Sequence, residues 1–185
     1  MELTIFKRSD TKKTTSNKLR IEKNIPAVIY ALGQENRNIY VSDAEWQAII
    51  RRIKPGSLST VIFNLKDGNK KLKAVVKEVQ YHVTTYEVQH IDFQILQDKV
   101  PINIKVPITC INKADCEGVK SGGTFRQVIR TLKVRCYPKD IPEEFVIDVI
   151  DLKMNQSLRL SDIKIPEKVR PMAKMKEVVV VIGKR

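Results

Sequence analysis

The sequence predicts a mainly β protein with short helices, in which an N-terminal barrel is followed by a second, mainly β domain. Two observations support this fold class. Runs rich in β-branched residues are separated by turn signals along most of the 185 residues, whereas convincing helical periodicity occurs in one segment of the first half. With 42% hydrophobic and 30% charged residues, the chain has the composition of a folded protein with a real core.

The helical segment is "YVSDAEWQAIIRRIKPG", residues 40–56. Ser42 followed by Glu45 is the pattern of a capping box, in which both side chains bond to backbone N–H groups at the start of a helix. The apolar side chains that follow fall on one face at helical spacing: Trp46, Ile49, Ile50 and Ile53. "KPG" is expected to end the helix. We therefore expect this apolar face to pack against the core, and we assign Trp46 no role in binding a ligand.

Three strand-like runs follow the helix: "STVIFNL", "LKAVVKEVQYH" and "EVQHIDFQIL". They are separated by turn signals at "DGNK" and "VTTY", which predicts consecutive hairpins. Hairpins in series with one helix indicate a small antiparallel barrel or a strongly curved sheet, and a barrel would also remove exposed edges.

A domain boundary is expected after Leu96, because "QDKVPINIKVPI" places two prolines in strand-like sequence, as at an edge strand or a boundary. The sequence therefore predicts domains at residues 1–96 and 97–185. The second block is again β-rich, and it ends in one more strand in "MAKMKEVVVVIGKR". Its "GVKSGG" either brings backbone close to a partner or forms a turn that needs positive φ.

The net charge of +13 is the main clue to function, because a surplus of this size repels itself unless a polyanion neutralises it. Both halves are basic, with +6 up to residue 96 and +7 after it. Nucleic acid is therefore the leading class of partner. The charge of the second half permits contact with nucleic acid there as well.

Export, membrane insertion and metal binding are not expected. The opening "MELTIFKRSD" has no apolar signal region, and the longest aliphatic run, "VVVVI", is far too short to span a bilayer. The three cysteines have no CxxC spacing, which predicts small apolar residues in a reducing cytoplasm: Cys110, Cys116 and Cys136.

A first cationic cluster lies in "TSNKLRIEKNIPAVIY", where Lys18 and Arg20 flank an inward-facing Leu19. Residues 1–24 carry a net +4, which is typical of a phosphate-binding edge. A solvated basic loop with a half-buried tyrosine is the alternative.

The local structure of this cluster follows from a few residues. Ser16 is expected to cap a short helix, and Asn24 to end it in a left-handed conformation. Pro26 is expected to start an apolar strand that leads to Tyr30.

A second cluster lies in "EVQHIDF", where strand alternation turns His90 and Asp92 to the outer face. A two-residue loop at Thr84 and Thr85 would place Lys77 opposite Asp92 and Val79 opposite His90, although another loop length would change this register.

Three interpretations of this face compete. Catalysis would need a nucleophile and a pocket, and no GxSxG, HExxH or glycine-rich phosphate loop occurs in the sequence. A metal would need a further ligand, yet His82 is the only other histidine. RNA recognition needs donors and acceptors that meet bases or sugar hydroxyls, which this face supplies, and we favour it over a plain polar surface.

These segments resemble a known family. "TSNKLRIEKNIPAVIY", followed by "VKEVQYH" and "EVQHIDF", is similar to the bacterial large-subunit ribosomal protein family called L-twenty-five in its short form and general stress protein Ctc in its long form. "GVKSGGTFRQVIRTLKVRCYPKDIPEEFVIDVIDLKMNQSLRLSDI" is similar to the C-terminal domain of the long form. The resemblance covers nearly the whole chain. It implies a six-stranded barrel that binds 5S rRNA in the large (50S) ribosomal subunit.

The resemblance also implies which residues contact RNA: Arg8, Lys13, Ser16, Lys18, Arg20, Tyr30, Lys77, His90 and Asp92. It implies no enzymatic activity, no metal and no cofactor, a cytoplasmic, ribosome-associated location, and 23S rRNA or neighbouring large-subunit proteins as further partners. The chain departs from the family at "TKKTTS", where many members have a glycine-rich run, and at Asn17, where many have arginine.

Two other functions stay open. The same barrel type occurs as the anticodon-binding part of glutaminyl-tRNA synthetase, so a tRNA-recognition module is one alternative. The lack of a synthetase catalytic domain in the sequence disfavours it. A stress-related RNA-binding or interaction protein that acts off the ribosome is the other.

Overall fold

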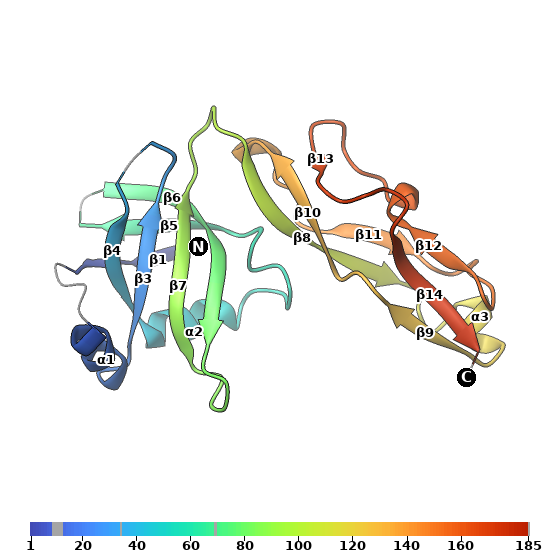
Figure 1. Cartoon of the computed structure of the whole chain (residues 1–185), viewed down its shortest axis with the longest axis horizontal. Helices are drawn as coiled ribbons and strands as arrows, with labels where there is room; N and C mark the ends of the chain where they lie inside the picture. The colour runs from blue at the N-terminus through green and yellow to red at the C-terminus, as the bar shows by residue number, and fades with distance from the viewer. Residues whose placement is uncertain (9–12, 34, 69, 185) are drawn as a thin grey trace. The chain divides into compact units, whose positions relative to one another are not determined.

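The computed structural model describes most of the chain: residues 1–8, 13–33, 35–68 and 70–184, with only the backbone of residue 13. The chain divides into two compact units, Met1–Val100 and Pro101–Arg185 (Figure 1). Both units are mainly β with short helices, which confirms the predicted fold class. In the described part of the chain, no helix is both long and apolar enough to cross a bilayer.

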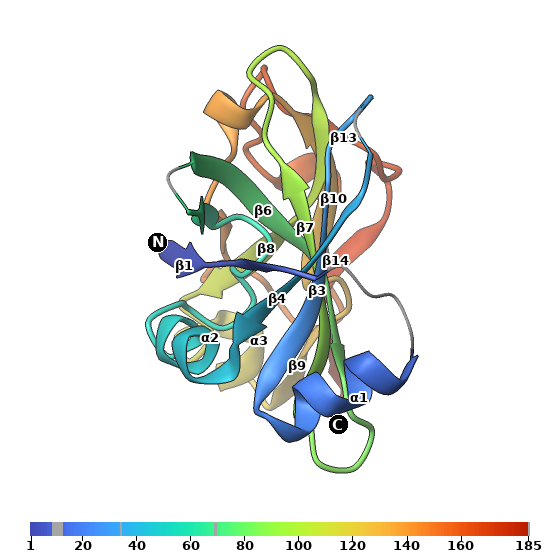
Figure 2. The same cartoon turned by 90° about the vertical axis from the view of Figure 1, so that its left-hand side faces the viewer.

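The described residues of the first unit form seven strands and two helices: β1 (Glu2–Thr4), β2 (Phe6–Lys7), α1 (Lys13–Ile21), β3 (Asn24–Tyr30), β4 (Arg37–Ser42), α2 (Asp43–Ile50), β5 (Ile62–Asp67), β6 (Lys70–Tyr81) and β7 (Val88–Ile95). The strands form one sheet in the order β1-β5-β6-β7-β3-β4-β2. Figures 1 and 2 both place α1 at one end of β3, beside the turn between β6 and β7.

Residues 2–7 close this sheet into a barrel. β1 pairs with β5 at one edge, and β2 pairs with β4 at the other, so one continuous segment covers both edges. Between the two strands, Ile5 donates its backbone N–H to the Lys66 carbonyl at 3.0 Å and buries its side chain. Counting this segment as one strand gives a nearly closed barrel with the six strands that the resemblance implies.

The barrel core is centred on aromatic side chains. Trp46 of α2 is fully buried, with its ring 5.9 Å from that of Phe63 and 6.2 Å from that of Phe93, centroid to centroid. Ile49 and Ile50 of α2 pack against the same core, together with Ile53 just beyond the helix. The helical face predicted from the apolar spacing is therefore a core face.

The predicted capping box of α2 is wrong. Ser42 is the N-cap residue, but its side chain makes no capping hydrogen bond. Glu45 instead accepts the backbone N–H of Thr4 through Oε2 at 3.2 Å. Because β1 contacts α2, the carboxylate bonds to this strand N–H and ties the helix to the closing segment of the barrel.

Two local predictions around α1 are also corrected. The left-handed residue after the helix is Lys23, with φ of 58°, whereas Asn24 is already the first residue of β3. Pro26 lies inside β3 and does not start it. It pairs with β4, while pairing of β3 with β7 begins only at Ala27, so the missing N–H of Pro26 interrupts no pairing with β7.

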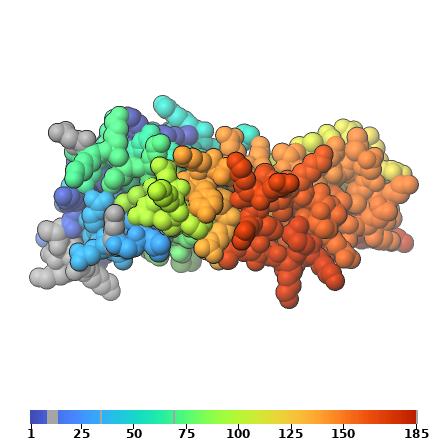
Figure 3. Space-filling view, turned by 90° about the horizontal axis from the view of Figure 1, so that it is seen from above, coloured from blue at the N-terminus to red at the C-terminus, as the bar shows by residue number. Residues whose placement is uncertain are grey.

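The second unit contains two sheets and a short helix, α3 (Glu117–Lys120). A four-stranded sheet has the order β11 (Phe145–Asp148), β8 (Ile102–Ile111), β10 (Thr131–Cys136) and β13 (Arg170–Pro171). A three-stranded sheet has the order β12 (Ser157–Arg159), β14 (Val178–Lys184) and β9 (Gly123–Gln127). In Figure 3, the later segments of this unit, orange to red, supply most of its visible surface.

The prolines around β8 have a physical explanation. Residues 102–107 of β8 pair with β10, whereas residues 108–111 pair with β11. Pro107 lies at the change of partner, where a missing N–H is tolerated. Pro101 precedes the strand, as the first residue of the second unit.

The cysteines are buried, as expected for small apolar residues. Burial raises the pKa of the Cys136 thiol to about 11, and it also raises the pKa of Cys110. Cys116 donates its Sγ–H to the Leu152 carbonyl at 3.2 Å.

The glycines of "GVKSGG" pack against the second unit itself. A Cβ on Gly118 would lie 2.8 Å from the Leu152 carbonyl oxygen, and one on Gly123 would lie 2.7 Å from the Gly118 carbonyl oxygen and 2.6 Å from Ile182 Cγ2. Gly122 supplies the turn with positive φ, at 90°. The close backbone approach therefore has an internal cause, and no external partner is needed to explain it.

Gly123→Ala is accordingly expected to destabilise the second unit by about 1–3 kcal/mol, because the methyl group has no space. Gly183→Ala is the matched control, since its Cβ would meet no atom within 4 Å. Urea unfolding of the full chain followed by circular dichroism measures both. Equal stability of the two variants would show that the contact at Gly123 relaxes freely.

Candidate nucleic-acid interface

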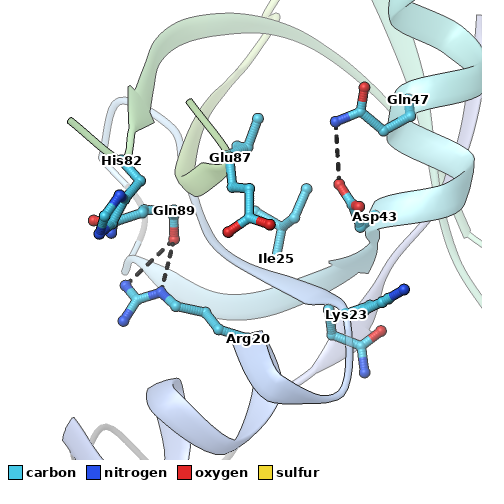
Figure 4. A pocket seen from close by; sticks show the side chains of 10 residues that line it. Arg20, Lys23, Ile25, Asp43, Gln47, His82, Glu87 and Gln89 are labelled. Atoms are coloured by element: carbon cyan, nitrogen blue, oxygen red, sulfur yellow. Dashed lines mark hydrogen bonds between the residues drawn. The ribbon is translucent and has the colours of Figure 1, made fainter. Parts of the chain in front are cut away.

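Helix α1 is attached to strand β7 by Arg20. The guanidinium donates to the Gln89 backbone carbonyl through Nε (3.4 Å) and Nη2 (3.3 Å), and to Asn17 Oδ1 through Nη1 (3.0 Å), as Figure 4 shows for Gln89. Arg20 itself is exposed. The fork is thus held in a fixed position while solvent still reaches it, which prepares it to bind an anion.

The Gln89 carbonyl is available because β7 has a bulge there. Gln80 pairs with His90 and Tyr81 with Val88, so Gln89 has no partner in the register. A bulge frees backbone groups from the ladder, and Arg20 bonds to this one. The residue immediately after the bulge is His90.

A second bulge at Lys77 corrects the predicted register of β6 and β7. Asp92 lies opposite Glu78, not Lys77, and His90 lies opposite Gln80, not Val79. The extra residue on β7 shifts the pairing by one, and Lys77, the extra residue on β6, restores it.

The turn between these strands is also longer than predicted. His82 donates its backbone N–H to the Glu87 carbonyl at 2.8 Å, which leaves residues 83–86 as a four-residue loop. The predicted two-residue loop at Thr84–Thr85 is therefore wrong. Tyr86 has φ of 57°, a conformation that Gly or Asn usually adopts, so the residue type did not indicate that the turn at "VTTY" extends to Tyr86.

His90 and Asp92 form a pair on the outer face of β7. The distance between His90 Nδ1 and Asp92 Oδ1 is 2.7 Å, and the side chains are 21% and 30% exposed. The bond at Nδ1 orients the ring and leaves Nε2 without a partner among the described residues. The pair therefore presents one ring nitrogen and one carboxylate to a ligand.

Tyr30 belongs to the same face. β3 and β7 are parallel neighbours, with Val28 beside Asp92 and Tyr30 beside Gln94. Burial raises the pKa of the Tyr30 phenol, and the negative charges of Asp92 and Glu78 raise it further. The phenol thus keeps its proton at neutral pH and serves as a hydrogen-bond donor.

Arg8 supports the other side of α1. Its Nη1 donates to Ser16 Oγ at 2.7 Å, and its backbone N–H donates to the Asn38 carbonyl at 3.0 Å. Ser16 lies inside the helix, which begins at Lys13, so the prediction that Ser16 caps it is wrong. The helix is therefore tied to the barrel by Arg8 and by Arg20.

The structure brings most of the predicted residues to one side of the barrel. Arg20 donates to the backbone carbonyl of Gln89, the residue before His90, and the charge of Asp92 raises the pKa of Tyr30. The two clusters are therefore neighbours. Lys18 is exposed on α1, and Lys77 is exposed at the β6 bulge. The side chain of Lys13 lies outside what the structure describes.

A cavity of about 340 Å³ lies beside this face, where α1, the β6–β7 turn and α2 meet (Figure 4). Its lining mixes two cations, two carboxylates and a histidine: Arg20, Lys23, Asp43, Glu87 and His82. His82 Nδ1 accepts the backbone N–H groups of Thr84 and Thr85 at 3.4 and 3.3 Å, so this ring holds the turn. Among the described residues, no group of three His, Cys, Asp or Glu side chains is placed to hold a metal ion.

Three residues of the face were missed from the sequence: Glu78, Gln80 and Gln89. Alternation alone assigns Lys77 and Val79 to positions opposite Asp92 and His90, and the bulges reverse this. Neither bulge contains a glycine, so the usual sequence signal of a bulge is missing.

Two family models match the chain and together cover nearly all of it. The Ribosomal L25p family matches residues 3–93, and the C-terminal domain of ribosomal protein TL5 matches residues 101–185. Curated relatives named "Large ribosomal subunit protein bL25" match over 185 residues, which is all of both chains. Those of Chlamydia trachomatis serovar L2, Chlamydia abortus and Chlamydia pneumoniae are 44%, 44% and 40% identical to this chain.

These matches place the barrel and its cationic helix in the class of ribosomal proteins. The chain belongs to the Ribosomal L25p family, in the long form that carries the TL5 C-terminal domain. This family consists of structural proteins, not enzymes, so the catalytic interpretation of His90 and Asp92 is excluded.

Proposed function

We propose that the chain is a structural protein of the large ribosomal subunit that binds 5S rRNA through the outer face of its first unit. The observation that carries this proposal is the junction of two unlike surfaces at Arg20: a cationic helix meets a polar strand face at one bulge. Family membership supports the ribosomal, translation-related role and the ribosome-associated location in the cytoplasm. The choice of 5S rRNA follows from the resemblance stated above.

The two surfaces would meet different parts of the RNA. Lys18 and Arg20 supply cations for phosphates, and Arg8 and Lys13 add to this charge. His90, Asp92 and Tyr30 supply acceptors and donors for base edges and 2′-hydroxyls, which A-form RNA displays in its wide minor groove.

Two carboxylates on the strand face further indicate how the RNA would be oriented on the protein. Asp92 and Glu78 lie opposite each other and repel phosphate. An ionised carboxylate accepts hydrogen bonds and donates none, so these two side chains favour amino groups and hydroxyls. The strand face would therefore contact a groove of the RNA, and α1 would contact the RNA phosphate backbone beside that groove.

We assign 5S rRNA binding to residues 1–96 and further ribosomal contacts to residues 97–185. The two compact units and the two matched regions support a division close to this boundary. A footprint of 5S rRNA with the full chain tests the assignment, since protection should disappear when residues of the first unit are changed and persist when residues of the second are.

The function is tested by direct binding of the full chain to 5S rRNA and to tRNA in competition. For several phosphate contacts, we expect the affinity for 5S rRNA to fall by roughly two to four orders of magnitude between low and moderate salt. Stronger binding to tRNA would support the tRNA-recognition alternative. Absence of the protein from large subunits in sucrose gradients would support a role off the ribosome.

Asp92→Ala is expected to weaken binding to 5S rRNA by about 1–2 kcal/mol, because the His90 ring loses its orienting partner and the groove loses an acceptor. The unfolding temperature should stay nearly unchanged, since both side chains face outward. Filter binding and thermal unfolding measure the two effects.

Glu78→Gln is the matched control for this variant. It removes the neighbouring carboxylate and leaves the His90–Asp92 pair intact. We expect unchanged or slightly tighter binding, because glutamine keeps an acceptor oxygen and the charge that repels phosphate is lost. A parallel loss of stability and binding in Asp92→Ala would instead make Asp92 a structural residue.

A further inference from the structure

The outer face of the four-stranded sheet in the second unit carries a cluster of cations. Residues of β10 alternate strictly between exposed and buried, and Leu132, Val134 and Cys136 face the core. The alternate side chains, together with their neighbours on β8 and β13, form what we call the cationic face: Lys105, Lys133, Arg135 and Arg170, all exposed.

The cations lie directly opposite one another across strands. Lys133 of β10 is paired with Lys105 of β8, and Arg135 of β10 is paired with Arg170 of β13. Like charges in directly opposed positions destabilise a sheet. The arrangement is therefore unfavourable in the free protein and becomes favourable when a polyanion covers it.

Two acidic side chains near the β8–β11 end of this sheet are bonded to other groups. Asp148 accepts Asn112 Nδ2 at 2.9 Å and the Ile150 backbone N–H at 3.0 Å, and Glu144 accepts Thr109 Oγ1 at 2.8 Å. Within the described chain, no ion pair involves any residue of the cationic face. Its charge is therefore not neutralised internally.

A cleft of about 660 Å³ continues the cationic face beyond Arg135 and Arg170. Lys168 also lines it, paired with Asp140 at 3.5 Å, and Glu167 lies nearby. These acids weaken the positive potential at the cleft. The strongest potential is therefore expected along Lys105 and Lys133, where no acid lies opposite.

We propose that the cationic face of the second unit is a second RNA-binding surface, which takes the phosphate backbone of an RNA other than the one bound by the barrel. An RNA is favoured over an acidic protein because a row of lysine and arginine side chains suits successive phosphates, whereas lysine is depleted at protein interfaces. Two exposed apolar residues, Ile111 and Val146, lie at the β8–β11 end, away from the cations. Two others lie beside the cations: Met172, whose N–H bonds to the Lys133 carbonyl, and Tyr137, which lines the cleft with Arg135. The proposal rests on the second unit alone and does not depend on the 5S rRNA assignment.

The test uses the full chain and a variant in which all four residues become glutamine (K105Q, K133Q, R135Q and R170Q). The matched control removes four other exposed charges of the same unit: K139Q, K164Q, K174Q and K176Q. The probes are protein-free 23S rRNA and 5S rRNA. Affinities are measured over a range of salt concentrations.

For the face variant, we expect weaker binding to 23S rRNA and a salt dependence reduced by roughly 3 in the slope of log K against log salt. Binding to 5S rRNA should be unchanged. The variant should unfold at the same or a higher temperature in low salt, because two repulsive pairs are removed. The control variant should bind 23S rRNA with a larger slope than the face variant.

Several results would overturn the proposal. One is a face variant whose affinity for 23S rRNA and salt slope are unchanged. Another is a control variant that loses as much affinity as the face variant, since net charge alone would then explain the effect. A loss confined to 5S rRNA would assign the face to the barrel's own ligand. Crosslinks from Lys133 that reach only proteins in intact large subunits would identify a protein partner instead.

Discussion

Substituting Lys18 and Arg20 together by alanine is expected to weaken binding to 5S rRNA by about 3 kcal/mol, roughly 150-fold. Each side chain would neutralise a phosphate, and the Arg20 fork is held in position by Gln89 and Asn17 before the RNA arrives. Arg20→Ala alone is expected to cost about 1–3 kcal/mol. Filter binding with the full chain at fixed salt measures both variants.

Arg20→Lys separates charge from geometry in this experiment. Lysine keeps the positive charge but lacks the planar fork that bonds to the Gln89 carbonyl, so we expect an intermediate loss of affinity. Lys54→Ala, on the loop after α2, is the charge-matched control for Arg20→Ala, and we expect it to leave binding unchanged. If the double variant binds as tightly as the parent chain, α1 is not part of the interface.

The barrel was predictable because its signals are local. Alternating β-branched runs and the turn at "DGNK" define β5 to β7, and the spacing of Trp46 and the isoleucines defines the core face of α2. The closing segment was not predictable in the same way. Residues 2–7 are short and pair with β5 and β4, which lie far along the chain, so only tertiary structure shows that they complete the barrel.

The candidate site was only partly predictable for a related reason. Alternation correctly turned His90 and Asp92 outward, and the basic residues of α1 were visible in the sequence. The cross-strand neighbours were wrong, because the bulges at Lys77 and Gln89 cancel each other over a few residues. The anchor of Arg20 depends on one of these bulges, so it could not be derived from spacing.

The interpretation of "GVKSGG" shows a different limit. Glycine permits close approach of any backbone, and sequence cannot distinguish a partner's backbone from the chain's own. In the structure, Gly118 and Gly123 approach each other and the strand β14. The signals of the second unit's cationic face were likewise hidden, since Lys105, Lys133 and Arg170 meet only through strand pairing.

Trp46→Ala is expected to have the largest effect on stability, a loss of about 3–5 kcal/mol in the first unit. The indole is fully buried between Phe63 and Phe93, so its removal leaves a cavity among rigid rings. Urea unfolding by circular dichroism should show an earlier transition for the first unit, while the transition of the second unit stays in place. Trp46→Phe should lose less, since it keeps an aromatic ring in the same site.

Binding distinguishes this structural role from a role at the interface. Because Trp46 lies in the core and not on the outer face of β7, the folded fraction of Trp46→Ala should bind 5S rRNA with nearly the affinity of the parent chain. Measurements at a temperature well below the transition, corrected for the unfolded fraction, provide the comparison. A large loss of affinity in fully folded Trp46→Ala would mean that the RNA-binding face depends on how the core is packed. In that case the core and the interface could not be treated as independent.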